Sequence, residues 1–73
     1  MAFLEQPGAG VGRAHVVRGS PLALLVELEE VGVQLWIPRS VIHENSEVFE
    51  ESGPASEGEL VVLEWWAEKN NLI

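Results

Sequence analysis

The side chains of this 73-residue sequence that could do chemistry are two histidines, five serines and twelve glutamates. His15 and His43 lie far apart, and no His-x-x-x-His spacing or cysteine is present to build a zinc site. No serine lies in the Gly-x-Ser-x-Gly turn that marks a nucleophile. The glutamate run also lacks the Asp/Asn alternation of a calcium loop. We therefore expect no enzymatic activity, no cofactor and no metal ion.

The glutamates are concentrated in the second half of the chain. Residues 40–73 hold eight of the twelve acidic residues and one of the four basic residues, and the net charge is −8. Such a field would repel nucleic-acid phosphates and anionic membranes, whereas it would steer association with a basic protein surface. The alternative is a solvated loop whose charge serves only solubility. The acidic run and its extension comprise Glu44, Glu47, Glu50, Glu51, Glu57 and Glu59.

Two adjacent tryptophans, Trp65 and Trp66, lie between two of the glutamates near the C-terminus. Adjacent residues on a helix point about 100° apart, so one tryptophan is expected to face the sheet and the other to point elsewhere. An exposed tryptophan is a typical interface anchor, although both rings could instead fill a small core. The predicted partner-binding residues are Glu44, Glu47, Glu50, Glu51, Glu64, Trp65, Trp66 and Glu68.

The elements that must position these residues form a small α+β domain. Residues 1–12 are rich in proline and glycine and predict a flexible arm, which leaves a single domain over residues 13–73. Short apolar or alternating runs predict strands over residues 14–18, 22–28, 33–37 and 59–63. We expect an antiparallel sheet of three or four strands, half-rolled into a barrel and closed by one C-terminal helix over residues 64–70.

The connection between the third and fourth predicted strands is long. Ser40 is a candidate N-cap for a short helical turn through residue 43. Residues 44–58 then predict an acidic loop pinned to the core by Val48 and Phe49. A loop of about 15 residues is unusual in so small a domain and often carries function.

No targeting signal is evident in the sequence. The N-terminus lacks a basic region followed by an apolar run, so no signal peptide is predicted. The longest apolar stretch, residues 21–26, is far shorter than the roughly 20 residues that span a bilayer. We therefore expect a cytoplasmic protein, in a bacterium or a virus-infected bacterium, that does not bind membranes.

Two stretches resemble a class of small phage-encoded proteins. They are Trp36-Ile37-Pro38-Arg39-Ser40-Val41-Ile42 and Glu64-Trp65-Trp66-Ala67-Glu68-Lys69, and the similarity extends over residues 22–73. The chain departs from the class at Leu63, where proline often precedes Glu-Trp. In size and character it is similar to the transcription regulators of this class, such as that of a Xanthomonas phage.

The resemblance implies a partner and an activity. It implies binding to host RNA polymerase, inhibition of initiation by sigma displacement, and promotion of antitermination. The alternatives are a small nucleic-acid-binding phage protein of replication or recombination, and a homo-oligomer that associates through its hairpin edge.

Overall fold

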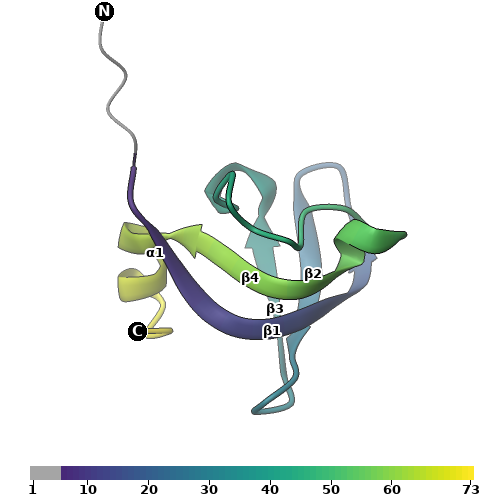
Figure 1. The fold of residues 1–73 in the computed structure, drawn as a ribbon, viewed down its shortest axis with the longest axis horizontal. Helices are drawn as coiled ribbons and strands as arrows, with labels where there is room; N and C mark the ends of the chain where they lie inside the picture. The colour runs from purple at the N-terminus through teal and green to yellow at the C-terminus, as the bar shows by residue number, and fades with distance from the viewer. Residues whose placement is uncertain (1–5) are drawn as a thin grey trace, which may run out of the picture.

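The computed structural model describes residues 6–73, which form a four-stranded antiparallel sheet and one short helix (Figure 1). The strands lie in the order β3-β2-β1-β4, and this architecture confirms the predicted α+β class. The strands are β1 (Gly8–Gly19), β2 (Ala23–Leu28), β3 (Val33–Pro38) and β4 (Glu57–Leu63). Two 3₁₀ turns, η1 (Arg39–Val41) and η2 (Pro54–Ser56), lie between β3 and β4, and α1 (Glu64–Lys69) follows β4 directly.

The long strand β1 holds the sheet together. Its first part pairs with β4, from Gly8 opposite Leu63 to His15 opposite Glu57. Its second part pairs with β2, and the register shifts once in each ladder. Irregularities of this kind bend a strand and increase its twist. The sheet is accordingly strongly curved (Figure 1), as expected of a half-rolled barrel.

The predicted flexible arm over residues 1–12 is wrong for residues 8–12, because these residues form the start of β1. The glycines that suggested disorder have structural roles in the strand. Gly12 lies at the register shift with a φ of 103°, and Gly8 packs so closely that a Cβ would lie 2.8 Å from the His43 ring. Residues 1–5 of the predicted arm lie outside the described residues. The folded domain therefore begins before residue 13.

The core forms from the inward-facing residues of the strands. On β2 the pattern alternates, with Leu24, Val26 and Leu28 buried and the intervening residues half-buried. β4 contributes Leu60 and Val62, both fully buried. The remaining buried hydrophobic residues are Ala14, Ile37, Val41, Val48 and Ala67.

The segment after η1 runs along the outer edge of β4. Ile42 forms a bridge with Val62, and the His43 N–H donates to the Val61 carbonyl at 2.9 Å. The predicted cap is wrong, because Pro38 occupies the N-cap position of η1 without a side-chain hydrogen bond and Ser40 lies inside the turn. This segment therefore covers a sheet edge that would otherwise be open.

The C-terminal helix ends at Lys69, one residue before the predicted end at residue 70. Asn70 is its C-cap, Asn71 adopts a φ of 58°, and the Leu72 N–H donates to the Ala67 carbonyl at 2.8 Å. Leu72 packs against the core, whereas Ile73 is exposed. Within residues 6–73 no helix has the length and apolar character needed to cross a membrane.

Candidate functional site

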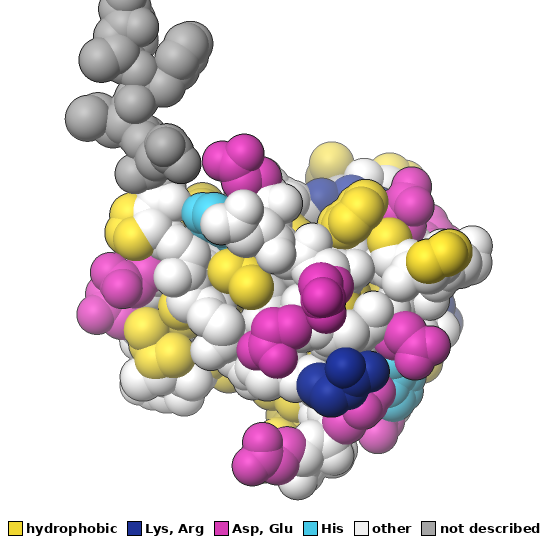
Figure 2. Space-filling view, viewed as in Figure 1, with side chains coloured by type: hydrophobic (Ala, Val, Ile, Leu, Met, Phe, Trp, Pro, Cys, Tyr) yellow, Lys and Arg dark blue, Asp and Glu magenta, His cyan; other side chains and the backbone are white. Residues whose placement is uncertain are grey.

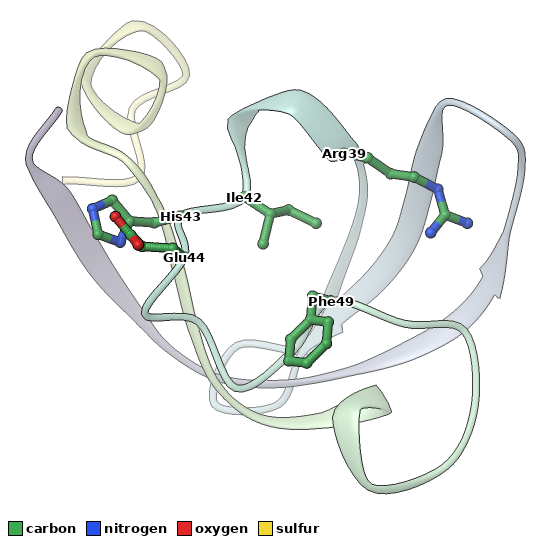
Figure 3. A pocket seen from close by; sticks show the side chains of 5 residues that line it. All are labelled: Arg39, Ile42, His43, Glu44 and Phe49. Atoms are coloured by element: carbon green, nitrogen blue, oxygen red, sulfur yellow. The ribbon is translucent and has the colours of Figure 1, made fainter. Parts of the chain in front are cut away.

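One hollow of the described surface lies inside the connection between β3 and β4. It has a volume of about 270 Å³ and is lined by Arg39, Ile42, His43, Glu44 and Phe49. Ile42 and Phe49 lie on two sides of the space, whereas His43 and Glu44 lie together at one end (Figure 3). The Arg39 guanidinium points away from this space. The hollow thus has apolar sides and an acidic end.

A second hollow shares Arg39 with the first. It has a volume of about 380 Å³ and is lined by Arg39, Glu50, Glu51 and Ser52. The Arg39 Nε and Nη2 atoms donate to the Ser20 carbonyl at 3.0 and 2.8 Å, and Nη2 also contacts Glu51 Oε1 at 3.1 Å. Arg39 is thereby held against the β1–β2 turn. We call the two hollows together the acidic groove.

The two histidines have structural partners. The Asn45 N–H donates to His43 Nδ1 at 3.0 Å, so the hydrogen-bond network assigns the proton to Nε2, which donates to the Gln6 carbonyl at 2.9 Å. His15 Nδ1 lies 3.1 Å from Glu29 Oε2. Neither ring lies beside a serine hydroxyl within hydrogen-bond distance in the described part of the chain. The His43 ring therefore contacts backbone groups, and the His15 ring contacts a surface carboxylate.

Phe49 is the clearest difference between the predicted and observed loop. Val48 is fully buried, as predicted, but the Phe49 side chain is 52% exposed rather than pinned in the core. The N–H groups of Phe49 and Glu50 both donate to the Ala55 carbonyl, at 2.9 and 3.1 Å. The backbone is thus fixed while the ring faces the groove. A rigidly mounted, exposed aromatic ring is a typical anchor for a partner.

Three of the predicted partner-binding residues make internal contacts, although Glu47 and Glu51 are also exposed. Glu47 Oε1 accepts a hydrogen bond from the Glu59 N–H at 2.8 Å, and Glu51 pairs with Arg39. Trp66 is half-buried and packs against the core.

The other five predicted residues face solvent. Trp65 is 50% exposed and its Nε1–H donates to Gln6 Oε1 at 3.2 Å, so one tryptophan faces inward and the other outward, as expected. The remaining members form no ion pair or side-chain hydrogen bond within residues 6–73: Glu44, Glu50, Glu64 and Glu68. Glu44 and Glu50 lie in the acidic groove, whereas Glu64 and Glu68 belong to α1.

Few cations compensate the acidic surface. Arg13 lies 3.8 Å from Glu29, and Arg39 pairs with Glu51. Figure 2 shows acidic side chains across the visible face, with Lys and Arg sparse between them. Nine glutamates of the described chain have no ion pair with Lys, Arg or His: Glu27, Glu30, Glu44, Glu47, Glu50, Glu57, Glu59, Glu64 and Glu68.

Sequence reasoning missed one exposed cluster on the outer face of the sheet. Arg18, Leu25 and Trp36 lie in one cross-strand row, and the Arg18 guanidinium lies 5.7 Å from the centre of the Trp36 ring. The outward position of Trp36 follows from strand alternation. The position of Arg18 beside Trp36 does not follow from alternation, because the irregularity between Val16 and Arg18 shifts the alternation of β1.

Comparison of the chain with protein-family models, with curated proteins and with solved structures finds no match. The acidic groove combines apolar sides with unpaired carboxylates. It is suited to an apolar side chain flanked by Lys or Arg.

Proposed function

We propose that this chain is a non-enzymatic docking protein that binds a basic surface of a larger host protein. The observation that supports this proposal most strongly is the acidic groove, where exposed Phe49 and unpaired Glu44 line one hollow and unpaired Glu50 lines the other. In this proposal, complementary charge accelerates encounter and the apolar anchor slows dissociation.

Bacterial RNA polymerase is the first candidate partner. The resemblance of residues 22–73 to small phage-encoded regulators supplies this choice. The stretch that resembles them contributes Arg39 and Ile42 to the acidic groove. In this proposal the chain occupies a basic polymerase surface that a sigma factor also needs, and thereby inhibits initiation and promotes antitermination.

Binding of the immobilised chain to purified polymerase core and holoenzyme tests the proposal. We expect binding that weakens as salt is raised, because exposed charges are screened. The variant Glu44→Gln with Glu50→Gln should lose at least about tenfold in affinity, as two interface charge pairs are removed. The matched control, Glu27→Gln with Glu30→Gln, removes the same charge from the β2–β3 hairpin and should lose much less.

Two outcomes of this test would contradict the proposal. Absence of binding to either polymerase form at low salt would exclude polymerase as the partner. Equal losses in the two variants would show that net charge, rather than the acidic groove, drives association. Phe49→Ala separates the anchor from the charge, because it should raise the dissociation rate and leave the salt dependence unchanged.

One observation favours a second candidate function, the binding of single-stranded nucleic acid in replication or recombination. Trp36 is 43% exposed on the outer sheet face with the Arg18 guanidinium over its ring, an arrangement suited to base stacking beside a phosphate. Titration of tryptophan fluorescence with single-stranded oligonucleotides tests it. Salt-sensitive quenching that Trp36→Ala abolishes would support this function, and unchanged fluorescence would exclude it.

A further inference from the structure

Strand β3 is hydrogen-bonded on one side only. Its ladder with β2 runs from Val33 opposite Leu28 to Pro38 opposite Ala23, and within residues 6–73 no strand pairs with its other edge. β4, at the opposite end of the sheet, is covered by the segment that contains Ile42. The β3 edge is therefore the open edge of the described sheet.

The hydrogen bonds fix which groups face this open edge. The Arg39 N–H donates to the Leu22 carbonyl at 2.8 Å, which extends the β2–β3 ladder by one hydrogen-bonded pair. Alternation in an antiparallel ladder then directs the backbone groups of Val33, Leu35 and Ile37 toward β2. The backbone groups that face outward are those of Gln34, Trp36 and Pro38.

Pro38 limits how a further strand can pair. It has no N–H, and as the N-cap of η1 its carbonyl accepts the first hydrogen bond of that turn, so the edge offers the N–H and carbonyl groups of Gln34 and Trp36. Proline at an outward-facing edge position is a common way to restrict strand addition. An added strand can therefore exchange complete hydrogen-bonded pairs only around Leu35.

We propose that the β3 edges of two copies of this chain pair antiparallel about a two-fold axis at Leu35. In this register Gln34 of each copy lies opposite Trp36 of the other, and each such pair exchanges both of its hydrogen bonds. An axis at Ile37 would place Trp36 opposite Pro38, which cannot donate. An axis at Val33 would require the Gly32 N–H, which already donates to the Leu28 carbonyl at 2.7 Å.

The side chains of β3 suit a second copy. The strand Val-Gln-Leu-Trp-Ile-Pro carries no charge, whereas β1, β2 and β4 each carry charged residues. Val33 and Trp36 are 51% and 43% exposed and would be partly covered by pairing. A single added strand buries less than the roughly 1,200 Å² of a permanent interface, so the dimer forms reversibly.

Sedimentation equilibrium tests the dimer without any other partner. The mean mass should rise from 8.0 kDa toward twice that value with concentration. Each copy carries a charge of −8, so added salt should strengthen the dimer, whereas it weakens docking to a basic surface. A chain that stays monomeric up to about 1 mM in high salt would overturn the proposal.

A pair of double variants tests the register. Gln34→Lys with Trp36→Lys places like charges opposite each other on both sides of the axis and should weaken the dimer by roughly tenfold or more. Gln34→Glu with Trp36→Lys makes the same pairs attractive and should restore association. Both positions are exposed, so the monomer should remain folded. Equal association of the two variants would overturn the proposed register.

Disulfide trapping provides an independent test, because the chain has no cysteine of its own. Leu35→Cys places two thiols directly opposite at the axis, within the Cα separation that a disulfide spans. Gln34→Cys is the matched control, because its two copies lie diagonally, at more than about 7 Å. Cross-linking of the Leu35 variant alone supports the proposal. Cross-linking of neither variant, of both equally, or of the Gln34 variant alone overturns it.

Discussion

Ser46 lies in a polar, loop-like part of the sequence, but its hydroxyl makes three hydrogen bonds that stabilise the fold. It is the buried polar residue of the described chain, at 5% exposure. Its Oγ donates to the Val48 carbonyl at 2.9 Å and accepts from the N–H groups of Val48 and Val61, both at 3.1 Å. One hydroxyl thus joins the β3–β4 connection to β4.

We expect Ser46→Ala to lower the free energy of unfolding by about 2–4 kcal/mol, because it leaves two backbone donors without their acceptor. Urea unfolding monitored by tryptophan fluorescence measures this loss. The control is Ser56→Ala, whose hydroxyl donates only to the Gly53 carbonyl at 2.7 Å within a turn and should cost about 1 kcal/mol or less. Equal losses in the two variants would contradict the linking role of Ser46.

Gly58 is held in a conformation that other residues rarely adopt. Its φ is 136°, and a Cβ would lie 2.9 Å from the Glu47 Cβ. Gly58→Ala should therefore destabilise the domain by about 1–3 kcal/mol, through backbone strain and displacement of Glu47. Gly10→Ala is the control in the neighbouring strand, since only the terminal Oε2 atom of Glu59 lies nearby, at 3.2 Å. A thermal melt in which Gly10→Ala is the more damaging change would refute this explanation.

At the scale of the element, two adjacent residues of the β3–β4 connection differ in role: Val48 is buried in the core, and Phe49 is exposed. Val48→Ala should cost about 2 kcal/mol of stability, because it removes buried methyl groups from the core. Phe49→Ala should cost less than about 0.5 kcal/mol, because the ring is half-exposed and its removal leaves no core cavity.

Denaturant unfolding and proteolysis together distinguish these two neighbours. Val48→Ala should also speed cleavage within the connection, which opens more readily without its buried contact. Phe49→Ala should leave the cleavage rate unchanged. The reverse order of effects would mean that the exposed ring, rather than the buried valine, holds the connection.

The sequence predicts the elements well where apolar residues alternate and poorly where glycine has a structural role. Leu24, Val26 and Leu28 identify β2 by alternation alone. The predicted β1 is too short, because Gly8 and Gly12 are typical of loops unless the packing against His43 and the register shift are known. Glycine composition alone does not distinguish these cases.

The candidate site was predictable in charge and not in geometry. The concentration of glutamates in the second half of the chain follows from counting, and the opposite orientation of Trp65 and Trp66 follows from helix periodicity. Which of Val48 and Phe49 faces the core depends on the path that an irregular connection takes along β4. No periodicity in the sequence specifies that path, and the contacts of Glu47 and Glu51 depend on it as well.

At the scale of the whole molecule, surplus negative charge opposes folding and favours docking. The molecule measures 38 × 24 × 18 Å, so at about 0.01 M salt the Debye length of roughly 30 Å lets most of its carboxylates repel one another. The unfolded chain relieves this repulsion by separating the charges. The folded state is therefore expected to be least stable at low ionic strength.

Thermal melts at salt concentrations from about 0.01 to 1 M test this expectation, since the Debye length falls to roughly 3 Å over that range. We expect stability to rise by about 1 kcal/mol, which shifts Tm by roughly 4–8 °C in a domain of this size. Glu44→Gln with Glu50→Gln should raise Tm at low salt and reduce its salt dependence. Melts at low protein concentration keep the proposed dimer from contributing. A Tm that stays constant or falls as salt is added would show that the glutamates are too far apart to repel, and the acidic groove would then lack the field that the docking proposal requires.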